Sequence, residues 1–527
     1  MTRSRTAVIA VLMMAVLILF SSMGSSIVAL AQSDRGVSMP LGPESPLSTS
    51  QSRVVTVFRM PAGTSIETHT DPLADWLAER PHPLLPAEIG GGLIAGIAEN
   101  RKLKILTISS LLGDTPSRTD RHTSLLVKCS FGRALPATIL ARDPVSQLAV
   151  LDITIPSHWE EIPGTEESPV TTASRPPASR PGRWGVLYSD PVALARSGTS
   201  AIAPTFVRRE GWGDSNPARE NRLNGTDSAP GPRWWIDRLP EPGITGAVFF
   251  RQENPGLVLP PSQGSHAGTG LEVLPLSGPM ERIVEDLLNG YEPEYGCLGL
   301  GLTSVSLDDV PEIHRTARSL WKTGLRINSL PENLPTRGEP LETGDLILSV
   351  REVHPAETAT DSTVMPNPFA PASMLQLPIQ TNAFHGRIQL FAPGDWAELL
   401  FWDESSRIIR NLVVRVGKMP VEKTSERVVT AQRVPLWRGL RVGFAPLERI
   451  ATESQIRWRY PPGVLVTEVR PDSPPDKAGI RAGDHIETIG ELEIHSPEEF
   501  LQAVNDWPGT VPMRLTERPA EVMIEGE

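Results

Sequence analysis

The sequence is poor in cysteine, has no cluster of basic residues and carries no long apolar run after its N-terminus. Its two cysteines, Cys129 and Cys297, lie far apart among 527 residues and fall in different predicted domains, so a disulfide framework is not indicated. The net charge is −12, and a surface that neutralises DNA or RNA phosphates needs clustered Lys and Arg. Nucleic acid is therefore not an expected partner, and the chain beyond its N-terminus is expected to be soluble.

Sequence signatures of metal and phosphate sites are also missing. There is no H-E-x-x-H pair, no cysteine cluster and no calcium-loop spacing. The glycine run at residues 90–92 is not followed by Lys-Ser or Lys-Thr, so it predicts a tight strand start rather than a phosphate loop. We predict no metal site and no cofactor.

The N-terminus has the order of segments found in an export signal. Arg3 and Arg5 precede an apolar run at residues 7–20, and small residues end in Ala29-Leu30-Ala31. This order predicts a signal peptide over residues 1–31 and a protein of the periplasm or cell envelope. Residues 6–32 are uncharged, so an uncleaved membrane anchor is the alternative. Residues 32–52, rich in Ser, Pro and Gly, predict a disordered tether.

The remaining chain predicts a mainly β protein of about three domains. Gly (43) and Pro (52) are abundant, and short apolar runs separated by turn residues favour a barrel or sandwich. Loop insertions are expected at 156–181 and 211–232. A helix is expected at 280–288, with Gly290 as its C-cap. The β runs occupy residues 54–58, 92–95, 104–107, 124–127, 137–140, 148–153, 185–188 and 246–250.

The last hundred residues carry the clearest pattern. A strand at 463–469 is followed by a turn at 471–474, then by a short helix and a Gly-Asp turn within 477–486, and Ser496-Pro497 begins a further helix. This region, 430–518, resembles the PDZ domains of the HtrA family, with a tail at 519–527. A more divergent copy spans 291–420, with a strand at 324–330, a Gly-Asp turn and its strand within 341–350, closing strands after 392–395 and a disordered Pro-rich insertion at 352–378.

PDZ domains bind peptides as an added strand, and the backbone N–H groups of one loop receive the terminal carboxylate. The family pattern for this loop is x-Φ-G-Φ, where Φ is apolar. The resemblance assigns peptide binding in the first copy to Cys297, Leu298, Gly299 and Leu300. In the second copy it assigns the loop to Gly439, Leu440, Arg441 and Val442. Arg441 replaces the family's glycine, so it either blocks close backbone approach or adds a cation for an acidic peptide.

The HtrA resemblance continues upstream, over 53–290, and implies a trypsin-like double β-barrel. Residues 105–112 are similar to the I-L-T-N-N-H-V-V stretch of the family and put Ser110 at the histidine position. Residues 132–151 match the stretch that leads into D-L-A-V-L and put Gln147 at the aspartate. Residues 242–249 are similar to P-G-N-S-G-G-P-L and put Thr245 at the serine.

These replacements predict that the triad chemistry is lost. A hydroxyl nucleophile needs an adjacent base, which Ser110 cannot supply, and backbone N–H groups of Gly243 and Thr245 alone would leave only a residual oxyanion hole. Rescue by His122 or Asp143 is not expected. We therefore interpret the chain as a pseudoprotease that binds peptides or protein C-termini as an adaptor, chaperone or regulatory subunit, with unfolded envelope proteins or an active HtrA relative as partners.

Two other interpretations stay open at this stage. One is an active serine endopeptidase with an unusual site, and the other is a structural protein of the envelope held by an uncleaved N-terminus. The trimers of the HtrA family also imply a homo- or hetero-oligomer.

Overall fold

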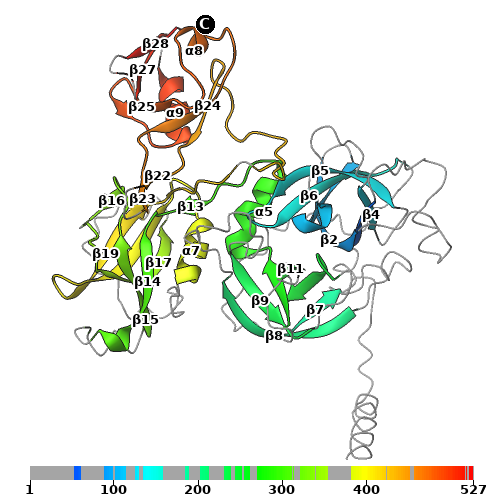
Figure 1. Cartoon of the computed structure of the whole chain (residues 1–527). Helices are drawn as coiled ribbons and strands as arrows, with labels where there is room; N and C mark the ends of the chain where they lie inside the picture. Colours follow the sequence, from blue (N-terminus) through cyan, green and yellow to red (C-terminus); the bar gives the residue numbers. More distant parts are fainter. Residues whose placement is uncertain are drawn as a thin grey trace, which may run out of the picture. The chain divides into compact units, whose positions relative to one another are not determined.

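Figure 1 shows the helices and strands of the chain in its computed structural model. The predicted signal peptide, the tether, the Pro-rich insertion beyond residue 353 and almost all of the two expected loop insertions lie outside the described residues. The structure describes residues 53–60, 88–98, 101–113, 125–129, 134–157, 184–188, 202–212, 231–238, 244–251, 254–260, 270–310, 313, 321–338, 340–353, 381–422, 424–451, 456–507, 509–516, 518 and 521–525.

The first six strands close into a barrel in the order β1-β2-β3-β6-β5-β4. Alternate residues of each strand face inward, so Val55, Val57, Ile105 and Val127 pack together inside it. A short 3-10 helix, η2 (Ser109–Leu112), follows β3 directly. The strands are β1 (Val54–Arg59), β2 (Glu88–Ala98), β3 (Lys102–Ile108), β4 (Leu125–Cys129), β5 (Leu135–Asp143) and β6 (Leu148–Thr154).

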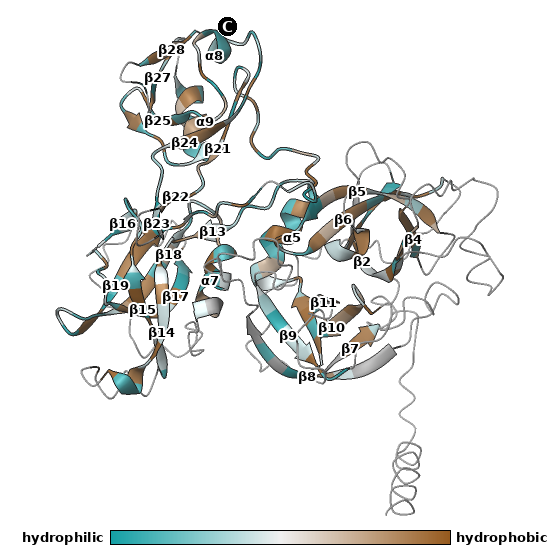
Figure 2. Ribbon diagram, viewed as in Figure 1, coloured by the Kyte–Doolittle hydropathy of each residue, from teal (hydrophilic) through white to brown (hydrophobic). Residues whose placement is uncertain are grey.

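The next six strands close into a second barrel, in the order β10-β11-β12-β9-β8-β7. Figure 2 colours much of β4, β6 and β10 as hydrophobic, in keeping with their burial. The predicted mainly β, double-barrel fold is confirmed. The strands are β7 (Trp184–Tyr188), β8 (Ile202–Trp212), β9 (Pro232–Ile236), β10 (Val248–Arg251), β11 (Asn254–Val258) and β12 (Leu271–Pro275).

Helix α5 (Glu281–Leu288) packs against both barrels in one shared hydrophobic core. A single-turn helix, η4 (Gly278–Met280), precedes it, and Ile283, Val284 and Leu287 pack into a cluster with residues of both barrels. Gly290 follows the helix at φ 73°, and its N–H donates to the carbonyl of Leu287 at 3.0 Å. The predicted helix and its C-terminal glycine are thus confirmed.

A first C-terminal module is built on a six-stranded sheet in the order β14-β15-β17-β18-β19-β16. Beside it lies the strand pair β13–β20, and α7 (Thr381–Gln389), which the sequence analysis missed, covers the sheet core through Phe384 and Ile388. The elements are β13 (Gly296–Cys297), β14 (Gly301–Ser306), η5 (Leu307–Asp309), β15 (Thr323–Ser329), β16 (Thr336–Arg337), β17 (Leu346–Val353), β18 (Trp396–Asp403), β19 (Ile408–Arg415) and β20 (Gly417–Lys418).

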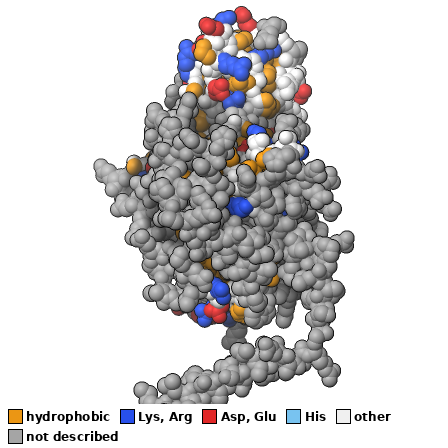
Figure 3. Space-filling view, turned by 90° about the vertical axis from the view of Figure 1, so that its right-hand side faces the viewer, with side chains coloured by type: hydrophobic (Ala, Val, Ile, Leu, Met, Phe, Trp, Pro, Cys, Tyr) orange, Lys and Arg blue, Asp and Glu red, His pale blue; other side chains and the backbone are white. Residues whose placement is uncertain are grey.

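A second C-terminal module has the sheet β21-β24-β25-β27-β28, with β26 paired to β25, and the predicted capped helix α9 (Pro497–Asp506). On the face drawn in Figure 3, basic, acidic and apolar side chains are interspersed over this module. Its other elements are β21 (Leu440–Phe444), β22 (Glu448–Ala451), β23 (Ile456–Arg459), β24 (Val464–Val469), α8 (Pro474–Lys477), β25 (His485–Ile489), β26 (Leu492–Glu493), β27 (Val511–Leu515) and β28 (Val522–Ile524).

Three details of this module differ from the sequence expectation. Helix α8 begins at Pro474, inside the expected turn and before residue 477, because the Ser473 side chain caps it by accepting from the Asp476 N–H. The expected tail contains β28, which pairs with β27, so the module extends beyond residue 518. The hairpin β22–β23 is inserted between β21 and β24, and no expected element corresponds to it.

Candidate functional site

The segments that carry Ser110 and Gln147 touch each other in the first barrel. Ser110 is exposed in η2, one residue after Ser109, whose N–H donates to the carbonyl of Gln147 at 2.8 Å. Gln147 is half-buried, at φ 62°, in the turn between β5 and β6. The structure therefore brings two of the three predicted positions together.

Thr245 lies in a turn before β10, and the start of β2 connects this turn to the first barrel. The N–H of Gly91 donates to the carbonyl of Thr245 at 2.9 Å, and the hydroxyl of Thr107 donates to the carbonyl of Gly91 at 2.7 Å. A Cβ on Gly90 would lie 2.6 Å from the Thr245 carbonyl oxygen and 2.3 Å from Cδ1 of Leu111 in η2. The glycine run is thus explained by close approach of the backbone at the contact between the barrels.

The three positions offer a hydroxyl, an amide and a hydroxyl. A proton acceptor of suitable pKa is what nucleophilic catalysis at a hydroxyl requires. Within the described ranges histidine occurs only at His385 in α7, His485 in β25 and His495 before α9, all in the C-terminal modules. His122 and Gly243, considered in the sequence analysis, lie outside the described residues.

Asp143, the nearest carboxylate before Gln147, is fully buried and fully engaged. Its Oδ2 accepts from the N–H of Ser146 at 2.8 Å and from the hydroxyl of Tyr295, and its Oδ1 accepts from Arg427 at 2.9 Å. Burial holds the pKa of the Tyr295 hydroxyl well above its usual range, so that hydroxyl stays protonated and donates. These contacts leave Asp143 unsuited to the role of base.

Arg427 belongs to a segment that we call the inter-module strap, residues 419–439. This segment follows the first C-terminal module and returns to the first barrel. Val428 pairs with Arg142 by a β-bridge, and the Thr430 hydroxyl donates to the carbonyl of Leu140 at 2.8 Å. Arg433 forms an ion pair with Asp286 of α5. The sequence analysis placed residues 430–439 in the second PDZ module and assigned residues 421–429 to no domain. It did not predict these contacts, because they join residues that are remote in the sequence.

The predicted peptide loop of the first module lies between β13 and β14. Leu298 and Leu300 are buried in the module core with Phe384 and Ile388 of α7. Gly299 has φ 66°, and its N–H donates to the sulfur of Cys297 at 3.3 Å. Burial raises the pKa of that thiol to about 11, so it remains protonated near neutral pH.

In the second module only Gly439 of the predicted loop precedes β21, because Leu440, Arg441 and Val442 are the first residues of that strand and pair with β24. Leu440 is buried, and its N–H donates to the carbonyl of Trp437 at 2.7 Å. Arg441 forms an ion pair with Glu468 of β24, its cross-strand partner, at 2.6 Å. The guanidinium, which the sequence analysis gave either a blocking role or a role as cation for an acidic peptide, is thus paired within the sheet.

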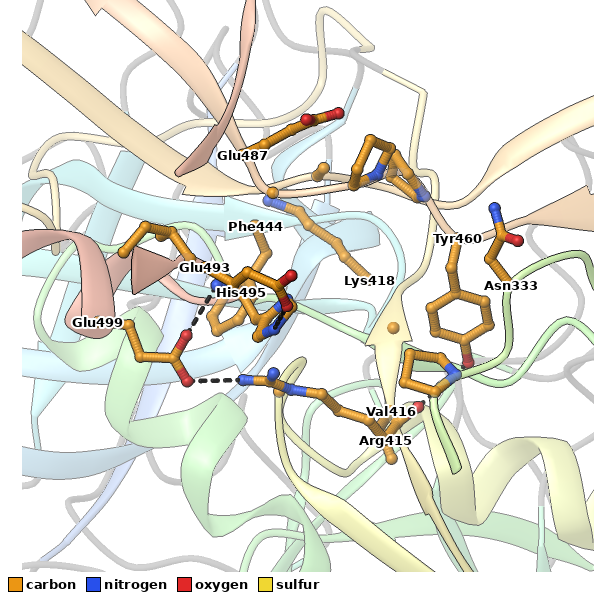
Figure 4. A pocket seen from close by; sticks show the side chains of 18 of the residues that line it. Asn333, Arg415, Val416, Lys418, Phe444, Tyr460, Glu487, Glu493, His495 and Glu499 are labelled. Carbon is orange, nitrogen blue, oxygen red and sulfur yellow. Dashed lines mark hydrogen bonds and ion pairs between the residues drawn. The ribbon is translucent and has the colours of Figure 1, made fainter. Parts of the chain in front are cut away.

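Between the two modules lies a cavity of about 670 Å³ that the sequence analysis did not predict (Figure 4). Glu499 of α9 accepts from the N–H of His495 in its own module at 2.7 Å, and its ion pair with Arg415 of β19 at 3.3 Å connects the two walls. Lys418 in the same wall pairs with Glu294 at 2.7 Å. Since these cations are already paired with carboxylates, the cavity does not present a field of one sign.

The described ranges also lack a candidate metal centre. These residues contain no group of three or more His, Cys, Asp or Glu that could hold a metal ion. None of their helices combines the length and the apolar character that crossing a membrane requires.

The sequence is similar to proteins named as periplasmic proteases. It is 26% identical over 395 residues to a probable periplasmic serine endoprotease DegP-like of Halomonas elongata, covering 74% of this chain and 71% of the relative. It is 23% identical over 376 residues to proteins of the same name from Brucella suis and Brucella abortus, covering 71% of this chain but only 62% of their length. These similarities support a relationship with serine endoproteases of the HtrA/DegP type.

No family model matches the chain. Among solved structures, the HtrA-type protease AlgW with a decapeptide aligns over 71% of this chain and 98% of its own, with a TM-score of 0.40 and 15% identity. The AlgW structure with a tripeptide has the same TM-score and identity.

Proposed function

We propose that this chain is an exported, HtrA-like pseudoprotease that binds peptides or unfolded protein segments through two PDZ-like modules. The observation that carries the proposal is the set of residues at the three triad positions: Ser110, Gln147 and Thr245. The contacts of their backbone segments support it, since Ser109 bonds to Gln147 and Gly91 bonds to Thr245. The periplasmic location is taken from the names of the relatives.

The chemistry at these positions argues against proteolysis. Thr245 is internal, so it lacks the N-terminal amine that serves as base in threonine proteases. Ser110 offers no imidazole, and the Asp143 carboxylate is held by Arg427 and Tyr295. An oxyanion hole without a base leaves a rate enhancement of roughly 10³ to 10⁴ over water, far below that of a working protease.

Peptide binding is supported by the sheet edges of the two modules. In the described residues β14 ends one sheet and β21 ends the other. The predicted carboxylate loop of the first module directly precedes β14, and that of the second module runs into β21. An extended segment adds to such an edge through backbone hydrogen bonds. The partners proposed are exposed protein C-termini, unfolded envelope proteins or an active relative. With them the chain would act as an adaptor, chaperone or regulatory subunit. We propose that it does so as part of a homo- or hetero-oligomer.

A fluorophosphonate probe, combined with degradation of unfolded casein, tests the pseudoprotease proposal. We expect the full chain to take up no label and to leave casein uncut over hours. The matched control is the triple variant Ser110→His, Gln147→Asp, Thr245→Ser, which restores the family's residues at the same three positions. Stoichiometric labelling of one Ser or Thr in the unaltered chain would contradict the proposal.

The alternative is an active endopeptidase with an unusual site, which the relatives' name, serine endoprotease, favours. In that case the label should appear on Thr245, and Thr245→Ala should abolish both labelling and casein cleavage. Peptide capture by the full chain, with no cleavage of the captured peptide, separates the two functions.

A further inference from the structure

The hairpin β22–β23 of the second module contacts the predicted carboxylate loop of the first module. A Cβ on Gly299 would lie 2.8 Å from Cβ of Trp458 and 2.9 Å from Cδ2 of Leu447. Gly299 is the residue whose backbone a terminal carboxylate would approach in a PDZ-like site. The space outside this glycine is therefore occupied by side chains of the same chain.

A second set of contacts fixes the base of the hairpin beside the loop. The Tyr460 hydroxyl, which is among the labelled groups in Figure 4, donates towards the carbonyls of Cys297 and Arg415, each at 3.2 Å. Leu447 is buried, and its N–H donates to the carbonyl of Lys418 at 2.9 Å. The Leu447 and Tyr460 side chains thus lie against β13, which leads into the loop, and against its partner strand β20.

The outer contacts of the hairpin are of a kind that a competitor could break. Glu332 of the first module exchanges two backbone hydrogen bonds with it, from the Glu332 N–H to Trp458 at 2.8 Å and from the Tyr460 N–H to Glu332 at 3.0 Å. The ion pair between Arg459 and Glu332 joins two exposed side chains, so it adds little stability. Moreover, the N–H of Gly299 donates to the Cys297 sulfur, which is a weak acceptor. A carboxylate that replaced the sulfur would form a stronger hydrogen bond.

We propose that the β22–β23 hairpin is an intramolecular plug of the first module's carboxylate loop, so that a peptide with a free, apolar C-terminus binds only when Trp458 withdraws from Gly299. The proposal rests on the proposed function, because it presupposes that this loop receives C-termini. The apolar preference follows from Leu298 and Leu300, which flank the glycine. A plug of this kind lowers the apparent affinity by the fraction of molecules in which the loop is open.

The test compares three full-length proteins: the unaltered chain, Trp458→Ala and Arg457→Ala. Arg457 is exposed on the same strand, one residue before Trp458, and faces the opposite side of the hairpin, so Arg457→Ala is the matched control. Peptides displayed with free C-termini and randomised in their last residues are selected on each protein. The selected peptides are then measured by fluorescence anisotropy, with a free carboxylate and as C-terminal amides.

We expect Trp458→Ala to bind its selected peptides at least about tenfold more tightly than the unaltered chain and Arg457→Ala do, and amidation to remove the gain. An additional variant of the cover, Tyr460→Phe, keeps the ring but removes both hydroxyl contacts, and a smaller gain in affinity is expected for it than for Trp458→Ala. Hydrogen exchange of the first module checks that it stays folded in both variants.

Two results would overturn the plug, and they differ in what they say of the proposed function. Equal, carboxylate-dependent binding by all three proteins contradicts the plug but leaves the peptide site in place. If no protein selects a peptide whose binding depends on the free carboxylate, the site itself is wrong, and the plug with it.

Discussion

Asp143 and Arg427, 284 residues apart in the sequence, form an ion pair in which the aspartate side chain is fully buried and the arginine side chain is 7% exposed. The pair joins the inter-module strap to the turn that carries Gln147. Tyr295 and Ser146 complete the hydrogen bonds of the carboxylate. A contact between the region of the C-terminal modules and the candidate site is therefore held by charge inside the protein.

Arg427→Met should lower the free energy of unfolding by about 3–5 kcal/mol, because it leaves a buried carboxylate without its counter-ion. The double variant Arg427→Met, Asp143→Leu should recover part of that loss. Urea denaturation of the full chain measures both. Arg481→Ala is the control, since Arg481 is 62% exposed in its pair with Asp476 and should change stability by less than about 1 kcal/mol. If Arg427→Met and Arg481→Ala lower the free energy of unfolding equally, the buried ion pair contributes no more to stability than an exposed one.

Gly90→Ala should destabilise the contact between the barrels, since the added Cβ meets the backbone oxygen of Thr245 at 2.6 Å. We expect a loss of about 1–3 kcal/mol, the usual range for overpacking. Gly96 on the same strand is the matched control, because a Cβ there meets nothing within 4 Å. The melting temperatures of the two variants provide the comparison. A Gly96→Ala loss as large as that of Gly90→Ala would indicate a general effect of alanine in β2.

Much of this fold could be predicted from patterns of neighbouring residues in the sequence. Strands such as β6 and β24 were predicted because apolar runs bounded by turn residues report burial directly. Helix α9 was predicted because residues 496–499 have the sequence of a capping box. In the structure the Ser496 side chain accepts from the Glu499 N–H, as that pattern implies. The reason for Gly90 and Gly91 was not predicted, because it depends on Thr245, more than a hundred residues away.

The features that the sequence did not reveal are contacts between distant segments. Helix α7 follows the Pro-rich insertion and has only Phe384 and Ile388 as strongly buried apolar positions, too few for a clear helical period. The inter-module strap and the cover over Gly299 depend on side chains such as Arg427 and Trp458, whose partners lie in other modules. The triad positions were assigned from short similar stretches, and the structure adds that their backbone segments meet.

Acidification should weaken the first C-terminal module through His385. Burial lowers the pKa of this histidine to about 4, whereas in the unfolded chain it is near 6.5. The unfolded state therefore binds more protons between these values, so stability should fall as pH decreases from about 6.5 to 4. Since the side chain keeps some exposure, we expect the free energy of unfolding to fall by about 2 kcal/mol, which is less than the whole pKa difference would give.

Urea unfolding between pH 7 and pH 4 measures this dependence. His385→Gln should flatten the profile in that window, while His495→Gln, at an exposed histidine, should leave it unchanged. A profile that both variants share with the unaltered chain would assign the dependence to other groups.

Leu298→Asp should unfold the first module rather than merely block its peptide loop. Leu298 is 3% exposed in a core with Leu300, Phe384 and Ile388, so the substitution buries a charge and removes apolar contacts. We expect a loss of about 3–5 kcal/mol, at the upper end of single substitutions. Thr303→Ala, on the exposed part of β14, is the control and should stay within about 0.5 kcal/mol. Hydrogen exchange of β15 and β17 reports the module directly: if both strands remain protected in Leu298→Asp, the leucine is a replaceable lining residue, and loss of peptide binding in that variant can be attributed to the loop itself.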